Sequence, residues 1–209
     1  MVEQRIQQHF IDSADLKYQA AQTLGKPVEA AVQALLACVT GGGKVLACGL
    51  GASATLAQHF ATLFIGRFER ERPELAAVAL SVDGAVLTAA QRGDDVAPAL
   101  ARQVRAIGQA GDVLLAISIT GQEASLLRAI EAAHERDMTV LALTGHGGGA
   151  MGLALRETDV QVCVPSERLA RIPGITLTDV GTFSTVGSGK PVQISVQGPD
   201  MFELERLAQ

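Results

Sequence analysis

Two hydrophobic patterns alternate along roughly the first 172 residues of this chain. Short apolar runs, typical of strands buried on both faces, are separated by stretches in which apolar residues recur every three or four positions, as in amphipathic helices. Five strands are predicted, at Lys44–Cys48, Ala76–Leu80, Val113–Ser118, Met138–Leu143 and Val160–Val164. Apolar strands that alternate with helices predict an α/β fold with a mostly parallel five-stranded sheet between helices.

The intervals between these strands predict helices over residues 3–24, 27–39, 53–68, 85–90, 96–107 and 123–136. Pro27 suits the first turn of a helix and three glycines follow at 41–43, so the amino-terminal region is expected as two helices. Ser53 is expected to cap its own helix. The glycine-rich stretch 145–149 predicts a flexible turn.

The composition changes near Ile172. Alanine and leucine dominate before it, whereas glycine, proline, serine and threonine are frequent after it. We therefore expect a domain over 1–172 and an atypical tail over 173–209. A docked β-hairpin and a poorly ordered tail both remain open for that tail.

Two glycine- and hydroxyl-rich turns follow predicted strands, and they carry the first functional hypothesis. The first turn (residues 49–54) contains Gly49, Gly51 and Ser53, and the second turn (118–123) contains Ser118, Thr120 and Gly121. Each opens a helix, where backbone N–H groups and the helix dipole favour an anion. Because both lie at carboxyl ends of strands, a small-ligand crevice is expected between them, with a phosphorylated sugar as ligand.

Composition narrows the classes of function and the cellular locations that remain open for this chain. The 209-residue chain is 48% hydrophobic and 3% aromatic and carries a formal charge of −5 without a basic run, so direct nucleic-acid binding is not expected. It shows neither a signal-peptide core nor an apolar run of membrane-spanning length, which predicts a cytoplasmic protein without membrane contact. Cys38, Cys48 and Cys163 are scattered among apolar residues and are interpreted as reduced thiols.

Residues 1–172 resemble the sugar isomerase (SIS) family, in particular its branch of phosphoheptose isomerases and DnaA initiator-associating proteins. The resemblance is carried by Gly-x-Gly-x-Ser-Ala at 49–54, Ala57–Phe60, Gly66–Glu69, Arg72-Pro73, Leu87–Ala89, Gln103–Ala106, Gly111–Ser118, Ala142–Gly145, Val164–Arg168 and Ala170–Ile172. It implies a three-layer, flavodoxin-like or Rossmann-like fold and homotetramers assembled partly through the amino-terminal helices. It also implies that the two turns bind a phosphosugar. We include Asp83 among the expected phosphosugar-binding residues.

The same resemblance implies a catalytic set that this chain only partly retains. Phosphoheptose isomerases have a His and a Glu four residues apart on the helix after the first turn, with a Gln and a His near the carboxyl terminus, and these four groups can also hold zinc. Here His59 matches the first, but the others fall on Leu63, Pro173 and Gly181. We therefore interpret His59 as a vestige with a structural, hydrogen-bonded role. No cofactor or metal is expected, zinc being possible only for an active isomerase.

Glu123 stands at the end of the second turn, where the family pattern has a serine. In one interpretation it is a solvent-facing residue and phosphate still binds. In the other its carboxylate takes the place of the anion and repels a phosphate in a partly desolvated pocket. We favour the second interpretation.

These substitutions favour a non-catalytic, oligomeric interaction module whose partner is the replication initiator DnaA. Two alternatives remain open. One is a phosphoheptose isomerase that converts sedoheptulose 7-phosphate to glycero-manno-heptose 7-phosphate, and the other is a phosphosugar-sensing regulator. The tail also resembles a short segment of RND-type efflux pumps, from 189 to 208, which implies no transport.

Overall fold

The structure is a computed structural model that describes residues 2–67, 71–80 and 98–164. The predicted helix over 85–90, the candidate ligand Asp83 and the tail over 173–209 lie outside the described residues. The predicted domain boundary near Ile172 also lies there, so it stays a prediction.

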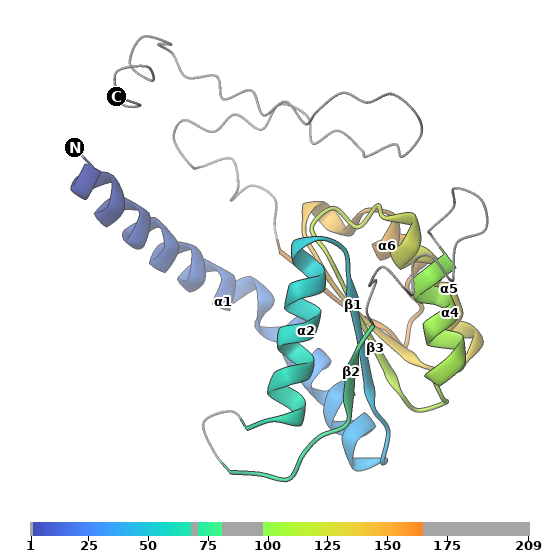
Figure 1. Cartoon of the computed structure of the whole chain (residues 1–209). Helices are drawn as coiled ribbons and strands as arrows, with labels where there is room; N and C mark the ends of the chain where they lie inside the picture. Colours follow the sequence, from blue (N-terminus) through green and yellow to red (C-terminus); the bar gives the residue numbers. More distant parts are fainter. Residues whose placement is uncertain (1, 68–70, 81–97, 165–209) are drawn as a thin grey trace, which may run out of the picture. The chain divides into compact units, whose positions relative to one another are not determined.

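The centre of the fold is a parallel sheet with strand order β2-β1-β3-β4-β5 (Figure 1). The strands are β1 (Val45–Gly49), β2 (Ala77–Ala79), β3 (Val113–Ser118), β4 (Thr139–Thr144) and β5 (Val160–Cys163). Every pair of neighbours is parallel. All five predicted strands are therefore confirmed, with no end shifted by more than one residue.

Helices cover both faces of this sheet, which confirms the predicted α/β layering (Figure 1). They are α1 (Val2–Thr40), α2 (Ala52–Ile65), α4 (Pro98–Ile107), α5 (Ala124–Glu135) and α6 (Gly149–Ala154). The last turns of α1 pack with α2 on one face, around Val45, Ala47 and Leu115. The other face packs against α4, α5 and α6, around Leu46 and Leu114. Successive β1 residues thus enter opposite cores, as a strand's alternation requires.

The predicted break at Pro27 is wrong, because α1 is one helix of 39 residues that contains this proline. Proline removes one backbone hydrogen bond and crowds the turn before it. The alanine- and glutamine-rich sequences on both sides favour helix strongly enough for the chain to continue through it. The result is a helix about 58 Å long, of which only the carboxyl-terminal part packs in the core.

The stretch 145–149 also differs from the prediction of a flexible turn. A 3-10 turn, η1 (His146–Gly148), leads directly into α6. Met151 of α6 is fully buried, and its backbone N–H donates to the carbonyl oxygen of Gly121 at 2.9 Å. This hydrogen bond and the buried side chain anchor a segment whose composition alone predicts flexibility.

Two buried carboxylates organise the other edge of the sheet, where the strands begin. Asp112 accepts hydrogen bonds from the backbone N–H of Lys44 at 2.9 Å, from its Nζ at 2.6 Å, and from the N–H of Gln109 at 2.8 Å. Asp159 accepts from the N–H of Val140 at 2.8 Å and lies 2.7 Å from Nε2 of His134. Buried carboxylates are tolerated when they are paired in this way.

No helix in the described ranges combines the length and the apolar character that crossing a membrane requires.

Candidate functional site

The first and second turns lie side by side at the carboxyl edge of the sheet. β1 and β3 are neighbours, and Gly49 at the end of β1 pairs in register with Ile117 near the end of β3. From β1 the chain moves to β2 on one side, whereas from β3 it moves to β4 on the other. In open α/β sheets, ligands bind where the strand order reverses in this way, so the space between the two turns is the candidate site.

Glycines in the first turn allow α2 to begin close against the sheet. A side chain on Gly49 would place its Cβ 2.5 Å from backbone atoms of Ser53, so only glycine fits. Gly51 has φ of 56° and is the N-cap residue of α2, without a side-chain cap. The prediction that Ser53 caps the helix is wrong, because Ser53 lies inside the first turn of α2 and is only 5% exposed.

In the second turn, the hydroxyl groups hold a carboxylate of the chain itself. Ser118 donates from Oγ to Oε2 of Glu123 at 2.5 Å, and Thr120 donates from Oγ1 to Oε1 at 2.9 Å. The backbone N–H of Gly121 donates to Oγ of Ser118 at 2.6 Å. Glu123 is the N-cap residue of α5, so its carboxylate also lies at the positive end of that helix. The side chains predicted to bind an anion therefore contact one another and an anionic group.

The glycine-rich turn after β4 supports the second turn from behind. Gly121 has φ of 70°, and a Cβ there would overlap the carbonyl oxygen of Gly148. His146 places Nδ1 3.1 Å from the carbonyl oxygen of Ile119. Sequence reasoning missed this support, although the run of glycines was its signal, because close backbone packing is one of the reasons a chain needs glycine.

His59 lies on the exposed side of α2, and Leu63 follows it by one helical turn and is half-buried. The imidazole forms no hydrogen bond with another described residue, so the part of the chain that the structure describes shows no structural role for it. Residues four apart share a helix face, and this face offers one imidazole next to an apolar side chain. His59 is therefore free to contact a ligand or a second subunit.

The described residues do not fit a zinc site. Across 2–67, 71–80 and 98–164, no three His, Cys, Asp or Glu side chains converge closely enough to hold a metal ion. A protein zinc site uses three or four such ligands.

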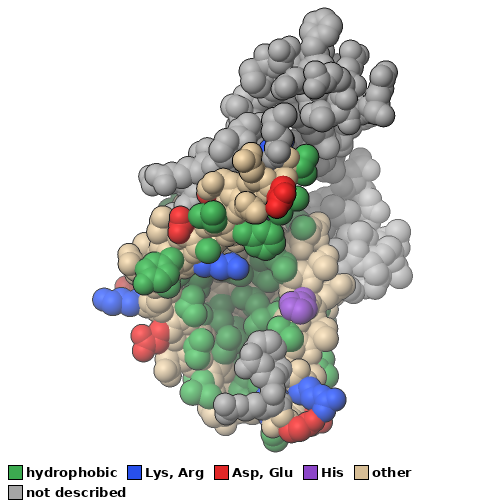
Figure 2. All heavy atoms as spheres, turned by 90° about the vertical axis from the view of Figure 1, so that its left-hand side faces the viewer, with side chains coloured by type: hydrophobic (Ala, Val, Ile, Leu, Met, Phe, Trp, Pro, Cys, Tyr) green, Lys and Arg blue, Asp and Glu red, His purple; other side chains and the backbone are tan. Residues whose placement is uncertain are grey.

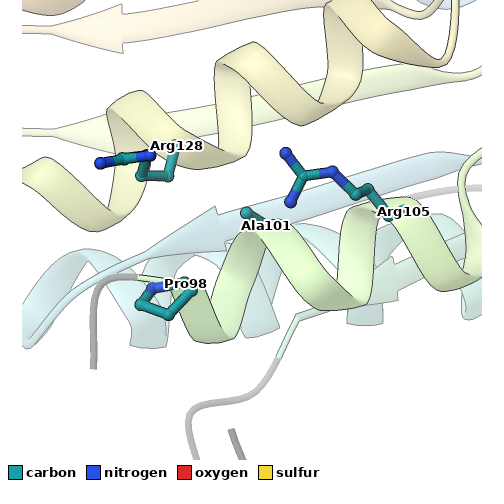
Figure 3. A pocket seen from close by; sticks show the side chains of 4 residues that line it. All are labelled: Pro98, Ala101, Arg105 and Arg128. Carbon is teal, nitrogen blue, oxygen red and sulfur yellow. The ribbon is translucent and has the colours of Figure 1, made fainter. Parts of the chain in front are cut away.

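A separate shallow pocket lies between α4 and α5 (Figure 3). It is lined by Pro98, Ala101, Arg105 and Arg128. Arg105 is already paired with Glu135, with Nε to Oε2 at 2.6 Å, and this hydrogen bond raises the pKa of Arg105 and lowers the pKa of Glu135. The pocket contains none of the residues in the first or second turn, so we do not take it as the substrate site.

Comparison with known proteins gives concordant results. The family model described as "SIS domain" matches residues 8–145. A phosphoheptose isomerase of Methylibium petroleiphilum is 60% identical over 172 residues, which is 82% of this chain and 86% of that protein. Among solved structures, a phosphoheptose isomerase of Neisseria gonorrhoeae is 42% identical with a TM-score of 0.71, covering 81% of this chain and 90% of that one. A phosphoheptose isomerase of Francisella tularensis is 38% identical with a TM-score of 0.74, covering 81% and 89%.

These relatives contradict the predicted function, a non-catalytic module that binds the replication initiator. Proteins that match four-fifths of the chain at 60% and 42% identity are phosphoheptose isomerases. The prediction gave more weight to a few substituted positions than to the agreement of the rest of the fold. The isomerase alternative is the one that the relatives support.

Proposed function

This chain belongs to the SIS domain family, and we propose that it isomerises a phosphorylated heptose, interconverting sedoheptulose 7-phosphate and glycero-manno-heptose 7-phosphate. The observation that carries the proposal is the 60% identity to a phosphoheptose isomerase over 82% of the chain. The stretch matched by the family model, 8–145, includes both turns of the crevice. The proposal therefore concerns the same edge of the sheet that the geometry singles out.

In this proposal, the phosphoryl group of the sugar binds between the two turns. Ser53, Ser118 and Thr120 supply hydroxyl groups, and the amino ends of α2 and α5 supply backbone N–H groups and favourable dipoles. Gly49 and Gly121 allow the backbone to approach closely, since a side chain at either position would overlap neighbouring backbone atoms. Asp83 stays in the proposed set on the sequence argument alone.

His59 is the residue we propose for proton transfer. Isomerisation moves a proton from C1 of the ketose to C2 through an enediol. In the same conversion the ketone oxygen O2 gains a proton to become a hydroxyl, and the C1 hydroxyl loses its proton to become the aldehyde. An imidazole can accept a proton at a ring nitrogen and then return it, so one side chain can serve both transfers. His59 lies six residues after Ser53 on α2, about 9 Å along the helix axis. This separation suits a sugar whose phosphate and carbonyl are at opposite ends.

The test incubates the protein with sedoheptulose 7-phosphate in deuterated water, once with and once without added Zn²⁺. NMR then measures both the turnover and the incorporation of deuterium. The wild type should incorporate deuterium at C2 of the aldose product. His59→Ala should lower kcat/KM by about a hundredfold or more, the usual contribution of a general base. His9→Ala, an exposed histidine on α1, is the matched control and should leave turnover unchanged. Absence of turnover and of deuterium incorporation in the wild type would overturn the proposal.

A second function, phosphosugar binding without turnover, is favoured by one observation. Leu63 provides no proton-transferring or metal-binding group on the helix face that carries His59. Such a regulator would bind sedoheptulose 7-phosphate with measurable heat in a calorimeter and would show no deuterium incorporation in the assay above. The same two measurements therefore separate the two functions.

We also propose that the chain assembles with copies of itself through α1. Large apolar side chains remain exposed along this helix: Val2, Ile6, Phe10, Ile11, Leu16, Tyr18, Val28, Val32 and Leu36. Figure 2, which views the molecule from the left of Figure 1, shows apolar side chains gathered around a hollow on that face. Exposed apolar surface of this extent is typical of an interface. Light scattering should give an oligomer for the wild type and a smaller species for Val32→Asp, with Asp15→Asn as control.

A further inference from the structure

We propose that Glu123 acts as an internal competitor for the phosphoryl group of the substrate. Its carboxylate accepts the hydrogen bonds of Ser118 and Thr120, which are the hydroxyl groups of the second turn. The inference deepens the proposed function and rests on it only in taking the bound group to be a phosphoryl group.

The carboxylate of Glu123 takes up the hydroxyl hydrogens of the second turn. A serine or threonine hydroxyl has a single hydrogen to donate. Ser118 donates its hydrogen to Oε2 of Glu123, and Thr120 donates its hydrogen to Oε1. The oxygen of Ser118 in turn accepts the backbone N–H of Gly121. While the carboxylate is in place, this turn has no hydroxyl hydrogen left for a phosphate oxygen.

The negative charge of Glu123 also opposes the binding of a phosphate. Glu123 occupies the N-cap position of α5, where the helix dipole and the backbone N–H groups favour one negative charge. Ser118 is only 4% exposed and Glu123 is half-buried, so the carboxylate is partly shielded from solvent and charges beside it interact more strongly than in bulk water. A phosphate dianion that enters must displace the carboxylate or lie beside a like charge. Either way its affinity falls.

The backbone of the second turn is hydrogen-bonded to the segment that follows β4. The backbone of the turn is held through the Met151 N–H to the Gly121 oxygen at 2.9 Å and through His146 at the Ile119 oxygen. Widening the turn to hold both anions would break these contacts. Side-chain rotation of Glu123, which is half-buried, is the movement that frees the two hydroxyl groups. The carboxylate thus sets how tightly this crevice binds any phosphorylated ligand.

The test compares binding of inorganic phosphate and of sedoheptulose 7-phosphate to the full chain by titration calorimetry at fixed ionic strength. Glu123→Gln keeps the size of the side chain and removes its charge, and Glu123→Ala empties the position. Each should raise the affinity for both ligands at least tenfold. Glu131→Gln removes the same charge from an exposed site on α5 and should change neither affinity. Circular dichroism establishes which variants fold, and one folded Glu123 variant is sufficient.

Affinities that stay equal or fall in the folded Glu123 variants would overturn the inference, and so would a complete lack of phosphate binding in all proteins. Turnover is measured separately in the wild type. A Glu123 variant that gains phosphate affinity while the wild type shows no turnover supports this inference and contradicts only the proposed isomerase. Turnover in the wild type without any gain on substitution contradicts this inference alone.

Discussion

Replacing Asp112 with alanine should destabilise the fold from the edge opposite the crevice. Asp112 is 2% exposed and joins the start of β1 to the start of β3 through the Lys44 N–H, the Lys44 ammonium and the Gln109 N–H. Alanine leaves two backbone N–H groups and one ammonium without their acceptor. Breaking a buried ion pair by removing one partner costs about 3–5 kcal/mol. Since the Lys44 side chain is 24% exposed and water can reach it, we expect the lower part of that range.

Urea unfolding followed by circular dichroism measures this loss, at one protein concentration for all variants. We expect the free energy of unfolding to fall by about 3–4 kcal/mol and the melting temperature by about 6–16 °C. Lys44→Met removes the ammonium but leaves the Asp112 carboxylate its two backbone N–H donors, so it should cost less than Asp112→Ala. Asp15→Ala, an exposed carboxylate on α1, should change the stability by less than about 0.5 kcal/mol. A loss below about 1 kcal/mol for Asp112→Ala would refute the reasoning.

Three further predictions concern single positions. Gly121→Ala should lower the free energy of unfolding by about 2–4 kcal/mol in the same urea assay, because its Cβ would overlap Gly148. Gly147→Ala is the control, since Gly147 also has a positive φ but lies in open space, and it should cost about 1 kcal/mol. Asp159→Ala should cost about 3 kcal/mol and speed amide hydrogen exchange in β4, and unchanged exchange would contradict it. Burial raises the pKa of Cys48 from 9.0 to about 12, so the unfolded thiol ionises first and stability should fall as pH rises from 9 to 12. Cys48→Ala should lack that part of the slope.

Most of the fold could be predicted because the local signals and the tertiary structure agree. β1 and β3 are short apolar runs between glycine-rich turns, and buried parallel strands have this pattern. Pro27 was misleading because a proline signals a helix start and an interrupted helix equally well in sequence. Residues 145–149 form a 3-10 turn that leads into α6, and not a flexible loop, because the buried side chain of Met151 anchors this glycine-rich segment. Such long-range contacts leave no periodic signal in the sequence.

The candidate site was predictable in position and less so in function. Strand ends rich in glycine and hydroxyl residues indicated the two turns, and the structure places these turns side by side. The suspicion that Glu123 takes the place of an anion agrees with its hydrogen bonds to Ser118 and Thr120. The functional prediction failed because the substitutions at Leu63, Pro173 and Gly181, together with Glu123 in the second turn, were taken as loss of the activity. A single chain's sequence does not reveal which other groups reach His59 in an assembly.

Hydrogen exchange of the wild type with and without saturating sedoheptulose 7-phosphate, followed by mass spectrometry, tests the central claim that the sugar phosphate binds between the first and second turns. The account predicts slower exchange in peptides that cover 49–54 and 118–123. Exchange that is unchanged in both turns, or slowed only around Arg105 and Arg128 between α4 and α5, would contradict it.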